Sequence, residues 1–391
     1  MDTHTLDVIV VGAGIAGATA GAQLAADHKV ALIEAEEAAG YHSTGRSAAL
    51  WILNYGPPDV RVLTGLSRAF FESPPPGFAE TPLMSHRPVL TIASADTMDD
   101  YRHVLETGTG LRELTPEAAR EMVPALRPGY VAAAVIEDDT FDMDVATLHQ
   151  GFLKLLRARG GRLALRSRSM RIERKAGLWE VEVTGGEVLR APTLVNAAGA
   201  WGDEVAAQAG VATVGLQPKR RTGVIIDPAP WAVAAWPAIM DAAGTWYSRP
   251  EARTRLMVSP VDETPMPPHD VQPDELATVG GEPVHQSELD VAIAIDRMQQ
   301  ALDINVTRVE RSWSGLRSFV PDGSLVIGWD AVAEGFFWSI GQGGYGIQTS
   351  PAAGKLVADL VSGRDPGPAA RILNDVDPNR FARTGPGTKK D

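Results

Sequence analysis

The glycine-rich segment from Gly12 to Gly17 (GAGIAG) restricts the possible folds more than any other part of the sequence. The apolar, β-branched run from Asp7 to Val11 before it is typical of a buried parallel strand. After it, the sequence predicts an alanine-rich helix over Ala18–Ala26 and a second strand over Val30–Ile33, which Glu34 closes. Strand, helix and strand within about 30 residues form the unit that binds a dinucleotide.

Each glycine of this turn has a separate expected role. Gly12 permits a tight turn, Gly14 lets the backbone approach a pyrophosphate, and Gly17 lets the helix lie close to the strand. The helix N-terminus offers free N–H groups and a positive dipole end to the phosphates. Glu34 follows the first glycine by about 20 residues, where an acid accepts hydrogen bonds from ribose hydroxyls. The motif alone also fits a glycine turn without a ligand, and the acid does not separate NAD from FAD.

Length, charge and the missing residue types narrow the function further. A chain of 391 residues is expected to form two domains. Its net charge of −13 argues against a nucleic-acid partner, and more weakly against docking on an anionic membrane. The absence of cysteine excludes disulfides, zinc–thiolate sites and iron–sulfur clusters, and we expect no metal site. No apolar stretch approaches the roughly 20 residues of a membrane span, and the N-terminus lacks the basic start of a signal peptide, so we expect a cytoplasmic protein.

Two further segments favour a flavin as the bound dinucleotide. Gly40–Ala49 (GYHSTGRSAA) is typical of a turn that leads into a helix start. Trp338–Ser350 (WSIGQGGYGIQTS) is typical of a strand, a glycine turn and a helix start. A second helix N-terminus there would stabilise the negative charge of a reduced flavin near its N1–C2=O edge, although a simple left-handed turn fits the same residues.

The rest of the chain alternates helical and strand-like segments. We expect a helix over Leu148–Arg159, a hairpin-like stretch over Ser169–Arg190, and a strand with a tight turn into a helix over Leu194–Trp201. Residues from Gln217 to Arg311 are strand-rich and include an exposed Pro- and acid-rich loop at Val261–Val284.

Taken together, the two ends and the middle of the chain resemble the D-amino-acid oxidase superfamily of FAD-dependent oxidoreductases. Within it, the chain is most similar to bacterial FAD-dependent D-amino-acid dehydrogenases, and especially to D-arginine dehydrogenases. The segments that carry the resemblance follow the expected order: VVGAGIAGA (10–18), GYHSTGRSAA (40–49), VNAAGAW (195–201), LQPKRR (216–221), GLRSFVPDG (315–323) and GFFW with QGGYGIQTS (335–350).

The resemblance implies a mixed α/β fold, with a Rossmann-like FAD-binding domain and a second, antiparallel-sheet substrate domain. The FAD-binding domain would be discontinuous and comprise residues 1–85, 145–217 and 312–370. The substrate domain would comprise residues 86–144 and 218–311. Residues 371–391 would form a tail, and the chain after Asp365 is expected to be loosely ordered because it contains Pro, Gly and Lys.

The resemblance also implies a set of flavin contacts, with FAD bound non-covalently and Met170 contributing mainly its backbone near the adenine. A covalent bond to His42 is the alternative for that residue. The implied contacts are Gly12, Gly14, Ile15, Ala16, Gly17, Glu34, His42, Ser43, Thr44, Arg46, Ser47, Ala48, Met170, Gly199, Trp201, Gly344, Tyr345, Gly346, Ile347 and Gln348.

A D-amino acid presents a carboxylate, which a guanidinium binds through two parallel hydrogen bonds. Arg221 and Arg317 are the candidates, each in a segment that matches the family. Arg220 competes with Arg221, but alternation along a strand would put only one of them into the pocket. Structural ion pairs are the alternative role for these arginines. Tyr55 and Tyr247 match pocket-lining positions, with core packing as the alternative, and the Gly344 carbonyl matches the position that holds the substrate amine.

The departures from D-arginine dehydrogenases concern the substrate side chain. Val89 stands where an acid would bind a cationic side chain, and Leu50 where a polar, histidine-type residue is expected. An unpaired buried guanidinium is costly. We therefore expect apolar or aromatic D-amino acids to be better substrates than cationic ones, unless an acid of the Val261–Val284 loop reaches the pocket. The pocket residues on which this rests are Leu50, Val89, Ala238, Met240 and Trp246.

The expected reaction is oxidative deamination by hydride transfer from the substrate Cα to flavin N5, without an obvious general base. The imine would hydrolyse to a 2-oxo acid and ammonia, and oxygen or a quinone-type acceptor would reoxidise the flavin. The alternatives are a glycine- or sarcosine-type oxidase or another secondary-amine oxidase of the same superfamily, a flavin-binding subunit without turnover, and, less favoured, a nicotinamide dehydrogenase.

Overall fold

A six-stranded sheet carries the N-terminal glycine turn. The computed structural model describes residues 6–272, 276–279 and 282–381. Within them, this sheet has the strand order β21-β22-β13-β1-β2-β9, and each neighbouring pair is parallel except β21 and β22. Its strands are β1 (Val8–Val11), β2 (Val30–Ile33), β9 (Arg162–Ala164), β13 (Thr193–Asn196), β21 (Val326–Trp329) and β22 (Phe336–Ile340).

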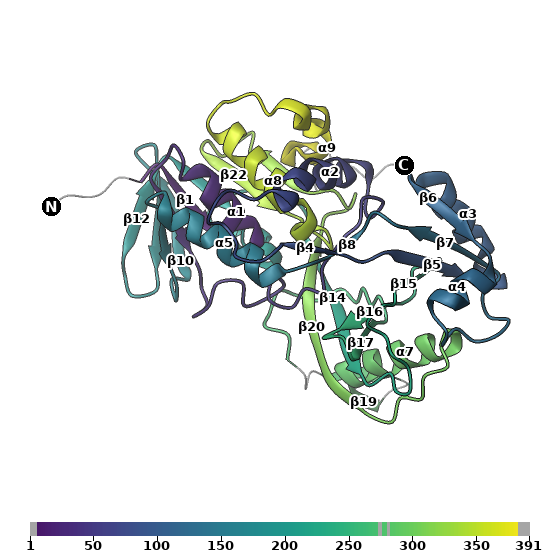
Figure 1. Cartoon of the computed structure of the whole chain (residues 1–391). Helices are drawn as coiled ribbons and strands as arrows, with labels where there is room; N and C mark the ends of the chain where they lie inside the picture. Colours follow the sequence, from purple (N-terminus) through teal and green to yellow (C-terminus); the bar gives the residue numbers. More distant parts are fainter. Residues whose placement is uncertain (1–5, 273–275, 280–281, 382–391) are drawn as a thin grey trace, which may run out of the picture.

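Helices cover one face of this sheet and a smaller sheet covers the other (Figure 1). Gly17 lets α1 approach β1, because a Cβ there would lie 1.8 Å from the Gly12 carbonyl oxygen. The helices on the first face are α1 (Ile15–Leu24), α2 (Pro58–Glu72), α5 (Val145–Ala158) and α8 (Gly346–Val361). The second face bears the antiparallel strands β10 (Ser169–Lys175), β11 (Leu178–Val183) and β12 (Val188–Ala191), with η2 (Gly199–Trp201) and α6 (Gly202–Gln208) following β13.

An eight-stranded sheet forms the second half of the molecule. Its order is β20-β14-β17-β16-β15-β5-β7-β6, and its neighbours are antiparallel except for the parallel pair β15–β5. Trp236, Trp246 and Met298 lie in its apolar core. The strands are β5 (Val89–Ala93), β6 (Leu111–Leu114), β7 (Ala133–Glu137), β14 (Gln217–Ile226), β15 (Ala238–Asp241), β16 (Tyr247–Glu251), β17 (Arg255–Ser259) and β20 (Val309–Phe319).

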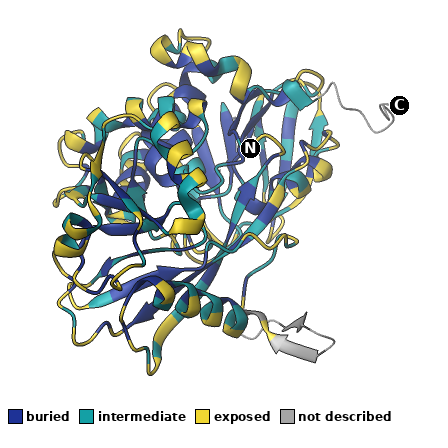
Figure 2. Cartoon of the chain, turned by 90° about the vertical axis from the view of Figure 1, so that its right-hand side faces the viewer, coloured by how far each residue is buried: buried dark blue, intermediate teal, exposed yellow. Residues whose placement is uncertain are grey.

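Smaller elements complete the architecture. Figure 2 shows dark blue, buried residues along the strands of both large sheets and yellow, exposed residues on the outer turns of the helices. Among the described residues, no helix combines the length and apolar character needed to cross a membrane. The remaining elements are the helices α3 (Met98–Thr107), α4 (Pro116–Met122) and α7 (Gln286–Ala301), the short η1 (Ala95–Thr97), the three-stranded sheet β3 (Leu50–Trp51), β8 (Phe141–Met143) and β4 (Met84–His86), and the pair β18 (Leu276–Val279) and β19 (Glu282–His285).

The mixed α/β fold class predicted from the sequence is confirmed, and so are the β1–α1–β2 unit and the strand–turn–helix around Gly199. Three local predictions are wrong. The segment Val261–Val284, predicted as an exposed loop, has Asp262 almost fully buried and contains β18 and most of β19. Residues 40–49 form successive turns that lead into β3, and no helix starts there. The chain after Asp365 is ordered to Phe381, because buried Ile372 and Val376 anchor it to the first core.

This C-terminal segment consists of η3 (Gly367–Ile372), α9 (Leu373–Val376) and η4 (Pro378–Phe381), and residues 382–391 of the predicted tail lie outside the described residues. The division into two domains stays a prediction. β20 includes residues on both sides of the boundary predicted between residues 311 and 312, and it pairs with β14 along its whole length.

Candidate active site

One connected cavity of about 640 Å³ joins the glycine turn to the space beside the second sheet. At one end it is lined by Glu34, Glu36 and Met170, and at the other by Tyr55 and Tyr247. Among the predicted flavin contacts, Gly17 and Tyr345 are not part of its wall. Gly17 instead packs against Gly12, and the Tyr345 ring lies 5.1 Å from that of Tyr55. The other predicted contacts line the cavity: Gly12, Gly14, Ile15, Ala16, Glu34, His42, Ser43, Thr44, Arg46, Ser47, Ala48, Met170, Gly199, Trp201, Gly344, Gly346, Ile347 and Gln348.

Two helix N-termini face this cavity. α1 and α8 start at the N-cap residues Gly14 and Tyr345, and neither residue makes a capping hydrogen bond with a side chain of its own. Gly12 has a φ of +96°, which favours glycine, and a Cβ there would lie 2.6 Å from the backbone oxygen of Ala197. Thr44 Oγ1 accepts a hydrogen bond of 2.9 Å from the Ile15 N–H and so fixes the turn. The result is an electropositive backbone surface that suits phosphate and reduced flavin.

Acidic groups stand at the end of the cavity near β2. Glu34 is held by the Ala13 N–H, which donates to Oε2 over 2.8 Å, and by the Glu36 N–H, which donates to Oε1 over 3.1 Å. His42 Nε2 lies 3.2 Å from Glu36 Oε1, and its ring centroid lies 4.6 Å from that of Trp201. A dinucleotide with ribose hydroxyls fits this end of the cavity, because the carboxylates are hydrogen-bond acceptors and the glycine turn follows directly.

Asp270 does not line the cavity, but it contacts Arg46 and His42, which do, and the sequence did not single it out. Its Oδ1 lies 2.6 Å from Arg46 Nη2 and 3.7 Å from His42 Nδ1. Burial opposes ionisation of Asp270, but the hydrogen bond and charge of Arg46 outweigh it and lower the pKa of the carboxyl. Arg46 also donates to the carbonyl oxygens of Ser314 and Val271, and thereby joins the turn at 40–49 to β20. The only sequence signal for Asp270 was its place in the acid-rich loop.

At the opposite end of the cavity, two guanidinium groups come together. Lys219 pairs with Arg317 in the β14–β20 register and Arg221 with Gly315, so the cations at 219, 221 and 317 share one face of the sheet. Arg317 Nη1 donates to the Tyr55 hydroxyl over 3.1 Å. Burial lowers the pKa of Arg221, and the nearby charge of Arg317 lowers it further. Such a concentration of positive charge suits an anionic ligand.

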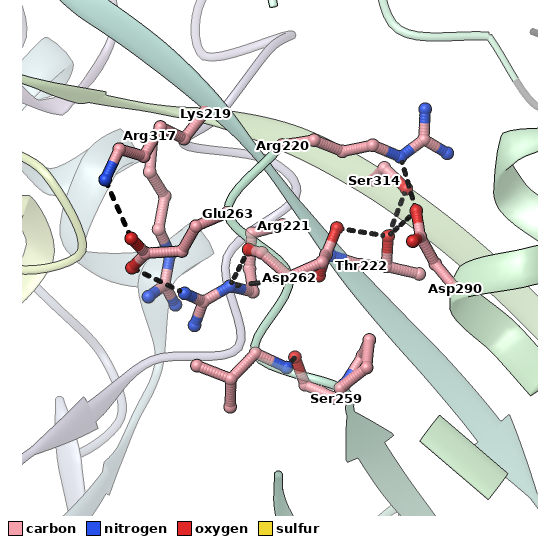
Figure 3. Close-up of polar contacts among 12 residues, drawn as sticks. Lys219, Arg220, Arg221, Thr222, Ser259, Asp262, Glu263, Asp290, Ser314 and Arg317 are labelled. Atoms are coloured by element: carbon pink, nitrogen blue, oxygen red, sulfur yellow. Dashed lines mark hydrogen bonds and ion pairs between the residues drawn. The ribbon is translucent and has the colours of Figure 1, made fainter. Parts of the chain in front are cut away.

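The competing arginine lies on the opposite face of β14. Arg220 is 1% exposed, and its Nε lies 3.0 Å from Asp290 Oδ2, whereas Arg221 lines the cavity (Figure 3). Strand alternation therefore separates the two arginines, as predicted. Gly344 lies against the arginine site, because a Cβ there would be 2.7 Å from Arg317 Nη1 and 2.8 Å from the Tyr55 hydroxyl.

The apolar wall differs in part from the prediction. Leu50, Met240 and Trp246 line the cavity. Val89 and Ala238 do not line it, because they lie in a buried cluster against which Leu50 and Met240 pack. The motif match gave the positions of Val89 and Ala238 in the sequence, but it did not show that both lie behind the residues that line the cavity. Within the described residues, no cluster of three or more histidine and acidic side chains could hold a metal ion.

Comparisons with known proteins agree with this architecture. The family model described as "FAD dependent oxidoreductase" (DAO) matches residues 7–360. Glycine oxidase of Geobacillus kaustophilus (strain HTA426) is 26% identical over 384 residues, which cover 93% of this chain and 94% of that protein. A D-amino acid dehydrogenase of Neisseria gonorrhoeae (strain NCCP11945) is 46% identical over 54 residues only, or 14% of this chain and 13% of that protein.

Solved structures show the same fold. The crystal structure of glycine oxidase from Geobacillus kaustophilus matches with a TM-score of 0.76 at 22% identity, and covers 93% of this chain and 96% of its own. That of L-proline dehydrogenase from P. horikoshii matches with a TM-score of 0.74 at 21% identity, and covers 97% and 98%. Because the family model spans almost all of the described residues and the cavity offers the donors that FAD requires, this chain belongs to the DAO family of FAD-dependent oxidoreductases.

Proposed function

We propose that this protein catalyses the FAD-dependent oxidative deamination of D-amino acids. The observation that carries the proposal is the pair of guanidinium groups, Arg221 and Arg317, at the far end of a cavity that begins at the dinucleotide turn. A carboxylate bound between them would be fixed by charge-assisted hydrogen bonds. The bound FAD would supply the acceptor, at its N5, for the hydride that leaves the substrate Cα.

The residues around the arginines would orient the rest of the substrate. The Tyr55 hydroxyl, which already accepts from Arg317, lies beside Gly344, whose carbonyl would take the substrate ammonium or amine. Tyr55 and Tyr247 would shield the reacting Cα–H from water. No side chain is proposed as general base, so the amine would lose its proton to solvent on binding. The imine product would then hydrolyse to a 2-oxo acid and ammonia.

The apolar wall supports a preference among D-amino acids. Leu50, Met240 and Trp246 offer no charge to a substrate side chain, and Val89 places no acid behind them. Asp241 also lines the cavity, but its Oδ2 already accepts a hydrogen bond of 2.6 Å from the Thr245 hydroxyl. A cationic side chain would lose its hydration and would have to compete with Thr245 for Asp241. We therefore infer that apolar or aromatic D-amino acids are preferred over D-arginine and D-lysine, with oxygen or a quinone-type compound as the final acceptor.

Oxidation of glycine or sarcosine is the second candidate, because the glycine oxidase relative aligns over 93% of this chain. Steady-state rates separate the candidates. The panel would contain D-leucine, D-phenylalanine, D-arginine, their L-enantiomers, glycine and sarcosine, with an artificial acceptor and with oxygen. The proposal predicts the highest kcat/KM for D-leucine or D-phenylalanine. A best rate with D-arginine would overturn the preference, and a best rate with glycine or sarcosine would select the second candidate.

A further inference from the structure

An acidic segment crosses the arginine site. After β17 the chain runs antiparallel to the start of β14, and we call residues Val261–Gln272 the acidic strap. The Arg220 N–H donates to the Thr264 carbonyl over 2.9 Å, and the Met266 N–H donates to the Pro218 carbonyl over 3.0 Å. These backbone bonds fix the strap beside the strand that carries Arg221.

Two neighbouring acids of the strap, Asp262 and Glu263, make different kinds of contact near Arg221. The Asp262 carboxylate accepts from the Thr222 N–H over 2.7 Å and from its hydroxyl over 2.9 Å, and its side chain is almost fully buried. Glu263 is 45% exposed, and its carboxylate has only charged partners among the contacts described. One oxygen lies 3.3 Å from Arg221 Nη2 and the other 2.8 Å from Lys219 Nζ (Figure 3). Asp262 is thus a fixed structural acid, whereas Glu263 is held by ion pairs that are partly solvated.

Glu263 therefore engages the same guanidinium that the substrate carboxylate would use. Arg221 donates its Nε–H to the Asp262 carbonyl over 2.9 Å, which leaves its Nη groups for carboxylates. Without a substrate, the partly buried guanidinium of Arg221 has Glu263 as a counter-charge. An exposed ion pair contributes little, so a better-placed carboxylate can replace it.

We propose that Glu263 is a specificity-determining residue that occupies the carboxylate-binding side of Arg221 and yields it to the substrate carboxylate. Lys219 retains Glu263 when it leaves Arg221, since the two side chains already pair. Because Glu263 stays near the site, it also repels substrates with a second negative charge. This inference rests on the proposed carboxylate site at Arg221 and Arg317.

Benzoate binding to the FAD-loaded protein tests the exchange. Benzoate has a carboxylate but no α-hydrogen, so it binds without being oxidised, and its dissociation constant follows from the change in the visible flavin spectrum. Glu263→Gln should lower that constant about two- to tenfold, because a competing anion is removed. Glu187→Gln is the matched control, since Glu187 is 46% exposed, pairs with Arg162 and lies outside the cavity wall. It should leave the constant unchanged.

A double-mutant cycle separates competition from a structural role. Lys219→Met should weaken benzoate binding about twofold or more in the native background, because Glu263 then pairs with Arg221 alone. In the Glu263→Gln background, the same substitution should have less effect. If Glu263 only braced the strap, both single variants would weaken binding, and that result would overturn the inference.

The substrate pair D-glutamate and D-glutamine gives a second, independent readout. The two differ by one charge at nearly equal size, so the ratio of their kcat/KM values should shift toward D-glutamate about threefold or more in Glu263→Gln. An unchanged ratio together with unchanged benzoate binding would overturn the inference while leaving the proposed function standing. If benzoate failed to perturb the flavin of the unsubstituted protein, the carboxylate site itself would be wrong, and the inference with it.

Discussion

Replacement of Arg317 by methionine is the perturbation with the largest expected effect on catalysis. Arg317 lies near the end of β20, where it donates to the Tyr55 hydroxyl over 3.1 Å and leaves no room for a Cβ at Gly344. Methionine has similar length and no charge, so it removes the guanidinium without opening a large space. In the proposed function, this guanidinium binds the substrate carboxylate through two hydrogen bonds.

The magnitude follows from those bonds. A hydrogen bond to a charged group contributes about 1.5–3 kcal/mol, and removal of one partner of a buried charge pair costs about 2–5 kcal/mol. With about 1.4 kcal/mol per factor of ten, a loss of about 2–5 kcal/mol means that Arg317→Met should lower kcat/KM about 30- to 4000-fold. Arg317→Lys keeps the charge but loses the planar fork, so we expect an intermediate loss of about 10- to 100-fold.

Stopped-flow reduction of the bound flavin by D-leucine, without oxygen, measures this effect directly. Arg311→Met is the matched control, because Arg311 lies on the same strand but is exposed and stacks 5.6 Å from the Trp313 ring. The control should stay within about twofold of the native rate. A rate for Arg317→Met within threefold of native, at equal flavin content, would refute the role given to the arginine pair.

Two further variants test the cofactor turn and the pH dependence of stability at a histidine that contacts it. Gly12→Ala should be purified with much less FAD, because its Cβ would lie 2.6 Å from a backbone oxygen and the residue has a φ of +96°. Gly185→Ala is the control and should keep its flavin, because Gly185 has a φ of +93° but open space around it. Full flavin content in Gly12→Ala would contradict the fit of this turn. His149, whose Nε2 lies 2.9 Å from the Ala13 carbonyl, has its pKa lowered by burial. Its contribution to stability is present above about pH 6.5 and is lost as the pH falls below that value, so His149→Gln should show a smaller fall in Tm between about pH 7.5 and about pH 5.5. An equal fall in both proteins would count against this assignment.

The features that the sequence predicted well depend on short spacings. The glycines at 12, 14 and 17 lie within one turn, and only a strand–turn–helix brings Gly12 and Gly17 into contact. Strand alternation likewise separated Arg221 from Arg220, because the two adjacent side chains of β14 must point to opposite faces.

The features that the sequence did not predict depend on contacts between residues far apart in the chain, or on how far a residue lies from the cavity. Asp270 reaches Arg46 and Glu263 reaches Arg221 only because the acidic strap folds back over the cavity. The Ser and Thr residues of the turn at 40–49 were expected to cap a helix that starts there. Ser43 instead donates to the Leu316 carbonyl, and Thr44 accepts from the Ile15 N–H at the start of α1. Val89 shows the third limit, because pattern matching gives a residue's place in the chain and not its distance from the cavity.

The central claim is that the arginine site holds an amino-acid carboxylate with its α-hydrogen toward FAD. Anaerobic addition of D-leucine to the FAD-loaded protein tests it most directly, with the visible flavin absorption as the signal and the 2-oxo acid as the product. We expect loss of that absorption with D-leucine, formation of one equivalent of 2-oxo acid per flavin, and no change with L-leucine. An unchanged spectrum with every D-amino acid of the panel, or reduction by the L-enantiomers alone, would contradict it.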